Sequence, residues 1–260
     1  MNDPASSART VPVNDLPTHG SVSTDLGVPA VALAIGAHPD DIEFGCGGTL
    51  AKWAAAGTTI HHLVLTDGGK GSWDPQQSEA ALIAVRQGEQ RHAAKVLGGG
   101  DVSFLGRTDG ELRNGVAEQW EVSRVIRQLR PDVVLGHDPW RRYRLHPDHR
   151  RAGFIVTDAI VAARDSHFFR DQNLATHRPS ALLLWEADEP NHVEDVSAFT
   201  ETKIAALLAH ESQLRSTMGI DEGASSEIAD FAERVRRQLA THGALAGLPG
   251  GESFHLITEI

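Results

Sequence analysis

Residues 31–41 read Val-Ala-Leu-Ala-Ile-Gly-Ala-His-Pro-Asp-Asp. The unbroken apolar run is typical of a buried β-strand, and the polar residues behind it mark the loop where that strand ends. In open α/β sheets, ligands bind at the loops that follow the carboxyl ends of the strands. We therefore expect His38, Asp40 and Asp41 at a functional edge of a sheet.

A second segment of the same chemistry is His146-Pro147-Asp148-His149, which stands at the start of an apolar-periodic helix. Together the two segments offer three histidines and three carboxylates, the usual ligands of a hydrolytic zinc site. Each segment has a simpler interpretation, because histidine and aspartate before a helix often act only as caps. Capping explains neither the paired histidines nor the first segment, so a metal hydrolase is the favoured interpretation.

Apolar runs and amphipathic periods alternate along most of the chain. We expect strands at 31–36, 59–65, 102–105, 133–136, 181–186 and 252–260, and helices at 47–56, 78–97, 116–129, 146–163, 197–210 and 227–239. Such alternation predicts an α/β fold with a doubly wound, mainly parallel, Rossmann-like sheet and helices on both faces. Residues 1–28 are polar and are predicted to form a disordered tail, which leaves 29–260 as a single α/β domain.

The composition of the chain indicates which classes of binding partner to expect. A formal net charge of −11 disfavours nonspecific binding to nucleic acids or anionic membranes. Cys46 is the only cysteine, and no secretory signal or bilayer-spanning run is present, so the cytoplasm is the expected compartment. We expect a small-molecule partner, and the sequence leaves an oligomer open.

Gly45-Cys46-Gly47-Gly48 follows the first strand and suggests an alternative, because glycine-rich turns at helix N-termini can bind phosphate. The full dinucleotide-binding spacing is absent, since position 50 is leucine, and the preceding acids would repel phosphate. We expect these glycines to let the helix approach the metal loop closely.

The two segments, with Gly45 to Thr49 behind the first, resemble the PIG-L (LmbE-like) family of zinc-dependent N-acetylglucosaminide deacetylases. The resemblance extends through 86–98 and 105–112. It implies Zn²⁺ bound by His38, Asp41 and His149, and Asp40 as the general base that takes a proton from water. Zinc lowers the pKa of a bound water to about 7, which makes amide hydrolysis feasible at neutral pH.

The same resemblance assigns roles to the neighbouring residues. His146 would stabilise the oxyanion as an imidazolium, and Asp148 would orient its ring and raise its pKa. Arg86 and Asp109 would contact the sugar. Alternatively, Arg86 forms an ion pair with Glu89 one helical turn away, and Asp109 belongs to an ordinary turn with Gly110.

The chain departs from the mycothiol branch of that family, which has a tyrosine at the position of Arg144 and a glutamate near Gly69 and Lys70. The basic run 140–144 indicates an anionic substrate, an aromatic sugar platform, or surface arginines paired with acids. His137 ends a predicted strand beside the site.

The expected function is removal of acetate from the 2-acetamido group of a glucosamine-containing small molecule or glycoconjugate. Two alternatives remain open. One is an amidase for another amide, such as a thiol S-conjugate. The other is a catalytically silent metal- or carbohydrate-binding protein.

Overall fold

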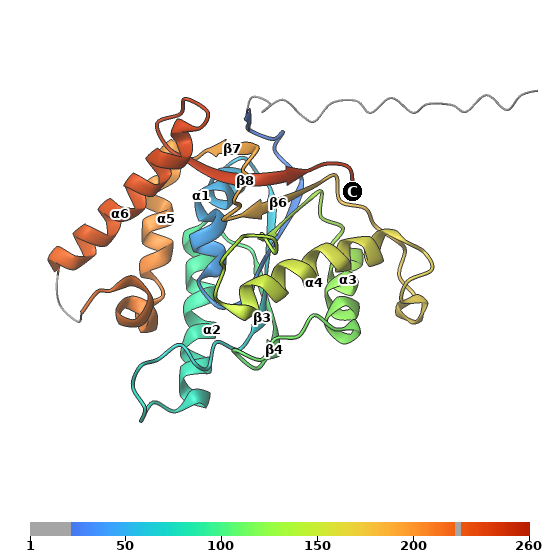
Figure 1. The fold of residues 1–260 in the computed structure, drawn as a ribbon, viewed down its shortest axis with the longest axis horizontal. Helices are drawn as coiled ribbons and strands as arrows, with labels where there is room; N and C mark the ends of the chain where they lie inside the picture. The colour runs from blue at the N-terminus through green and yellow to red at the C-terminus, as the bar shows by residue number, and fades with distance from the viewer. Residues whose placement is uncertain (1–21, 222–224) are drawn as a thin grey trace, which may run out of the picture.

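A single eight-stranded sheet runs through the computed structural model, which describes residues 22–221 and 225–260 (Figure 1). The strand order is β1-β7-β8-β6-β5-β2-β3-β4, and neighbouring strands are parallel except that β8 is antiparallel to β6 and β7. The strands are β1 Ser23–Thr24, β2 Val31–Gly36, β3 Thr59–Thr66, β4 Asp101–Arg107, β5 Val133–His137, β6 Ala181–Trp185, β7 His192–Asp195 and β8 Gly251–Ile257.

Helices cover both faces of this sheet. The helices are α1 Asp41–Ala55, α2 Glu79–Val96, α3 Val116–Leu129, α4 Pro147–Arg164, α5 Thr200–Leu208 and α6 Ser225–Ala244, with short helical turns at Arg170–Gln172, Ser197–Phe199, Glu211–Gln213 and Leu214–Met218. Figure 1 shows α3 and α4 on one side, and α1, α2 and α5 on the other with α6 beside α5. The predicted fold class is confirmed.

The side chains of β2 explain why this strand lies at the centre. Leu33 and Ile35 point into the apolar core with α3 and α4, whereas Ala32 and Ala34 point into the core with α1. A parallel strand buried on both faces has this continuous apolar pattern. From β2 the chain builds β3 and β4 towards one edge and returns to β5 and β6 on the other side. The switch point between β2 and β5 is where such sheets bind ligands.

Several elements differ from the sequence expectations. Strand β7 was not expected, α6 is longer than the helix expected at 227–239, and β8 ends at Ile257 rather than at residue 260. Helix α1 begins at Asp41 rather than residue 47, with a break in helical geometry at Cys46. Ser23 and Thr24 pair with β7, so the prediction of a disordered tail is wrong for residues 22–28, while residues 1–21 lie outside the described part. Strand β1 has only two residues and is held by backbone hydrogen bonds, so it has no hydrophobic periodicity that the sequence could reveal. The single-domain assignment stays a prediction.

The glycines of α1 serve packing. A Cβ at Gly45 would lie 2.5 Å from Trp185, and one at Gly48 would lie 2.9 Å from Val196, so the helix approaches these residues rather than the metal loop. The backbone N–H groups of Gly48 and Thr49 donate to the Glu252 carboxylate at 2.9 and 2.7 Å. Because a carboxylate already occupies these donors, the turn is not a phosphate site.

None of the helices among the described residues is both long enough and apolar enough to cross a membrane.

Candidate active site

The two polar segments meet at the switch point, as expected from the positions of β2 and β5. A cavity of about 610 Å³ lies there. It is lined by seven of the eight predicted site residues, namely His38, Asp40, Asp41, Arg86, Asp109, His146 and His149. The eighth, Asp148, is fully buried beneath the cavity and contacts His38.

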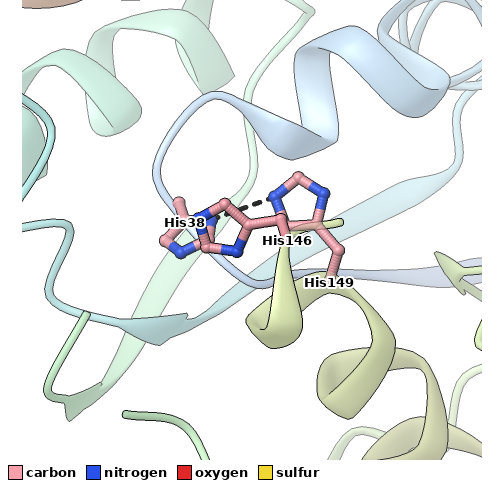
Figure 2. A group of neighbouring side chains, drawn as sticks. All are labelled: His38, His146 and His149. Carbon is pink, nitrogen blue, oxygen red and sulfur yellow. Dashed lines mark hydrogen bonds between the residues drawn. The ribbon is translucent and has the colours of Figure 1, made fainter. Parts of the chain in front are cut away.

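The three predicted metal ligands are in mutual contact. His38 Nδ1 lies 3.2 Å from His149 Nε2, the contact that Figure 2 draws as a dashed line. Asp41 places Oδ2 3.3 Å from His38 Nδ1 and Oδ1 3.3 Å from His149 Nε2. Metal bonds of about 2.0–2.2 Å in a tetrahedral site separate the ligand atoms by about 3.4 Å. The spacing and the donor types therefore fit a divalent ion.

The electrostatics of the cluster also favour a cation. Burial acts to lower the pKa of His38, but its contacts with Asp109, Asp148 and Asp41 raise that pKa well above the usual value. Burial lowers the pKa of His149 to about 3, so this ring is neutral, as a ligand must be. The buried site contains several carboxylates, and their negative charges favour a positive charge among them.

Two carboxylates orient His38. Its Nε2 lies 3.3 Å from Asp148 Oδ2 and 3.2 Å from Asp109 Oδ1. Asp148 Oδ2 also accepts from Gly110 N–H at 2.6 Å, and Asp109 Oδ2 accepts from Lys70 N–H at 3.1 Å. A carboxylate behind a ligand histidine fixes its ring. Asp148 thus orients His38, and the predicted orientation of His146 by Asp148 is wrong. The predicted sugar contact of Asp109 stays a prediction.

His146 caps α4, and its Nδ1 accepts the backbone N–H of Asp148 at 3.3 Å. Its ring stacks on that of His149 with 4.7 Å between the centroids (Figure 2). Partial burial and the charge of His38 lower the pKa of His146, although Asp148 acts to raise it. This direction is opposite to the raised pKa that was expected, and the oxyanion role of His146 stays a prediction. The neutral ring has its proton on Nε2, because Nδ1 is an acceptor.

Asp40 has a left-handed backbone, with φ of 104°, and its side chain is buried. Burial raises the pKa of its carboxyl to about 6, although Arg86 acts to lower it. Arg86 donates to the carbonyl oxygens of Gly68 at 2.8 Å and Pro39 at 2.6 Å, and lies 3.4 Å from Asp40 Oδ2. The predicted sugar contact of Arg86 stays a prediction.

The alternative ion pair of Arg86 with Glu89 is not formed. Glu89 instead accepts hydrogen bonds from the backbone and side chain of Ser212, at 2.7 and 2.6 Å.

His137 also lines the cavity, at the end of β5 where the sequence places it. Its Nε2 lies 3.2 Å from Asp41 Oδ2, and its Nδ1 accepts from Trp185 Nε1–H at 3.0 Å. Because tryptophan can only donate, Nδ1 is the acceptor of that hydrogen bond, while Nε2 faces both Asp41 and the backbone N–H of Ala37, 3.4 Å away. His137 therefore contacts Asp41, one of the predicted metal ligands. Its place at the end of β5 was the one available signal.

The arginines of the basic run pair with acids, which is the simplest of the three interpretations. Glu186 Oε1 contacts Arg144 at 2.7 Å and Arg141 at 3.5 Å, and Asp188 contacts Arg142 at 3.3 Å. Arg144 Nε also donates to His149 Nδ1 at 3.1 Å. The run therefore offers no unpaired arginine from 141, 142 or 144 to an anion.

Known proteins are similar to this chain in sequence and fold. The sequence profile of PIG-L (GlcNAc-PI de-N-acetylase) matches residues 33–160. Diacetylchitobiose deacetylase of Thermococcus kodakarensis is 37% identical over 184 residues, which cover 70% of this chain and 69% of the relative. The 1D-myo-inositol 2-acetamido-2-deoxy-alpha-D-glucopyranoside deacetylase of Rhodococcus opacus is 35% identical, covering 88% of this chain and 86% of its own.

Among solved structures, N,N'-diacetylchitobiose deacetylase from Pyrococcus horikoshii with a bound inhibitor superposes with a TM-score of 0.80 at 27% identity. The match covers 88% of this chain and 84% of that one. The fold, the clustered ligands and these likenesses agree, and the chain belongs to the PIG-L family of deacetylases.

Proposed function

We propose that this protein is a divalent-metal-dependent hydrolase that removes the N-acetyl group from an N-acetylglucosamine-containing small molecule or glycoconjugate. The observation that carries the proposal is a buried carboxylate, Asp40, with a pKa of about 6 beside three clustered metal-ligand side chains. A protein that only binds metal needs no such extra carboxylate. The names of the relatives, which are deacetylases of acetamido sugars, support the same reaction.

His38, Asp41 and His149 would hold the ion, which we propose to be Zn²⁺. When bound, zinc lowers the pKa of a water to about 7 and polarises a carbonyl. A histidine that binds through Nε2 has its proton on Nδ1. Arg144 donates to Nδ1 of His149 and is paired with Glu186, and with an ion held by His149 the pair with Glu186 would be the contact that Arg144 keeps.

The remaining residues would move the protons. Asp40 takes a proton from the attacking water, and a pKa near neutrality suits a general base. His146 donates its Nε2–H to the oxygen that becomes negative when the amide carbon turns tetrahedral. The C–N bond then breaks, the amine leaves with the proton that Asp40 accepted, and the acetic acid that remains loses its own proton to give acetate.

The charges of the cavity favour an uncharged sugar. Arg86 is bonded to two backbone carbonyls, and Arg144 is paired with Glu186. Lys70, which also lines the cavity, is paired with Glu111 at 3.1 Å. Arg86 and Asp109, which line the cavity, are the proposed sugar contacts. We also propose that the protein acts in the cytoplasm.

Acetate release from N,N'-diacetylchitobiose by the zinc-loaded protein tests this function. We expect turnover with this neutral acetamido sugar and little with an N-acetylated cysteine S-conjugate or with a phosphorylated acetamido sugar. Preferential hydrolysis of the S-conjugate would favour the alternative amidase. Absence of any acetate release from a metal-loaded protein would favour a silent binding protein.

A further inference from the structure

The peptide bond between Pro39 and Asp40 is held at both of its polar ends by one helix. Arg86 donates to the Pro39 carbonyl oxygen at 2.6 Å, and Gln90 Oε1 accepts the Asp40 N–H at 3.0 Å. Arg86 and Gln90 lie four residues apart on α2, so they project from the same face. Both side chains are buried.

These two hydrogen bonds are important because Asp40, the next residue, has an unusual backbone conformation. Asp40 has φ of 104°, which an L-residue adopts only when its surroundings enforce it. The orientation of the preceding peptide plane sets the direction in which the Asp40 side chain leaves the backbone. Two hydrogen bonds to one peptide therefore determine where the proposed base points.

The amide of Gln90 is itself oriented by a buried pair. Gln90 Nε2 donates to Glu43 Oε1 at 2.7 Å, and Glu43 Oε2 lies 3.2 Å from His210 Nε2. Gln90, Glu43 and His210 are each fully buried. Because Glu43 can only accept from Gln90, the amide nitrogen must face Glu43 and the amide oxygen must face Asp40.

We propose that Gln90 is a positioning residue for Asp40, and that Glu43 and His210 keep its amide in the productive orientation. The inference rests on the proposed function, because it assumes that Asp40 is the base. Gln90 acts through the backbone of Asp40 and contacts neither substrate nor ion in this scheme.

Gln90→Met tests the proposal, since methionine keeps the length of the side chain and removes both hydrogen bonds. We expect kcat to fall about tenfold to a hundredfold, because small misplacements of a catalytic group have effects of this size. KM and bound zinc should stay unchanged. Gln172→Met is the matched control, because its amide also bridges buried or half-buried groups away from the cavity, namely Trp120 O, Ser123 Oγ and Arg127. This control should retain the wild-type kcat.

A double-mutant cycle separates positioning from a general structural effect. If Gln90 acts through Asp40, Gln90→Met should cause no further loss of kcat in an Asp40→Asn background. Equal losses in both backgrounds would overturn the proposal, as would an unchanged kcat in folded Gln90→Met. If Gln90→Met does not fold, Glu43→Gln is tested in the same double-mutant cycle. We expect it to lower kcat less than Gln90→Met would, and only when Asp40 is present.

A crystal structure of Gln90→Met, or of Glu43→Gln, tests the same idea without any assay. We expect the peptide between Pro39 and Asp40 to rotate and Asp40 to leave its left-handed conformation. An unchanged conformation overturns the positioning role. If the wild-type protein releases no acetate, the proposed function fails, while this structural result still decides whether Gln90 holds Asp40.

Discussion

Two buried histidine–glutamate pairs lie at the two ends of helix α1, where Glu43 is in the first turn and Lys52 of the last turn contacts Glu194, and the two pairs have similar contact distances. His210 Nε2 lies 3.2 Å from Glu43 Oε2 behind the active site, and His192 Nε2 lies 2.9 Å from Glu194 Oε1 in β7. All four side chains are fully buried. Burial and pairing alone therefore do not separate a structural pair from a functional one.

Their connections differ. The pair in β7 is bonded to the segment before β2, through Ser23 Oγ and Leu26 N–H at 2.9 and 2.8 Å, and to the last turn of α1, through the Lys52 ammonium at 2.7 Å. Those contacts fasten β1 to the sheet edge. The pair behind the site continues through Gln90 to Asp40, and His210 Nδ1 has no hydrogen-bond partner among residues 22–221 and 225–260. What a buried polar pair is connected to indicates its role.

Removing one histidine at the active site and one in β7 should give the largest difference in bound zinc and in activity. His149→Ala deletes one of three proposed ligands and should leave the purified protein without bound zinc and without activity. His192→Ala should keep a full complement of zinc, as measured by elemental analysis. Zinc retained in His149→Ala would refute the ligand assignment.

Replacing the base should have the next largest effect. Asp40→Asn should lower kcat by about a hundredfold to ten-thousandfold, because an amide cannot accept the proton of water. Zinc content should stay at the wild-type level, since Asp40 is not among the proposed ligands. Turnover close to wild type in a zinc-loaded variant would move the base to another residue.

His146→Ala should reduce kcat by about a hundredfold to a thousandfold, the usual effect of removing one oxyanion donor. The three proposed ligands remain in this variant, so zinc should be retained. Steady-state kinetics and metal analysis on the same sample check both statements. Loss of zinc would instead make His146 a ligand, which its stacking on His149 leaves geometrically open.

At the other end, Glu194→Gln should leave kcat unchanged and lower the free energy of unfolding by about 1–3 kcal/mol. The variant leaves buried partners of the carboxylate unsatisfied, which has a cost of this order. Denaturant unfolding of the zinc-loaded protein measures the change. A fall in kcat with unchanged stability would contradict a purely structural role for the β7 pair.

The smallest effect concerns the pH dependence of stability at His210. Burial acts to lower its pKa, but Glu43, Asp40 and Glu89 raise it above the usual 6.5. Because the folded protein binds this proton more tightly than the unfolded chain, protonated His210 contributes its full stabilisation below about pH 6.5. The contribution is lost as the pH rises through the higher pKa of the folded state. The stability difference between wild type and His210→Gln should therefore shrink above pH 6.5. A difference independent of pH would exclude a charged His210.

Much of the architecture and of the polar cluster at the cavity could be predicted from local patterns. The apolar run of β2 predicted its own bounds, because a strand buried on both faces must be apolar throughout. The two polar segments predicted the cluster of His38, Asp41 and His149, because the carboxyl ends of parallel strands meet at one edge. Helix α1 was missed in its first turns, because the glycines that permit packing against Trp185 weaken a helix pattern.

The hydrogen-bond partners were decided by the tertiary structure alone. Asp40 meets Gln90 across 50 positions, and Glu43 meets His210 across 167, so no local spacing relates them. Asp148 orients His38 rather than His146 because the crossing of α4 over the end of β2 determines which ring its carboxylate reaches. Composition and periodicity specify which residues are buried and where elements end, whereas the partner of each buried polar atom depends on how those elements pack.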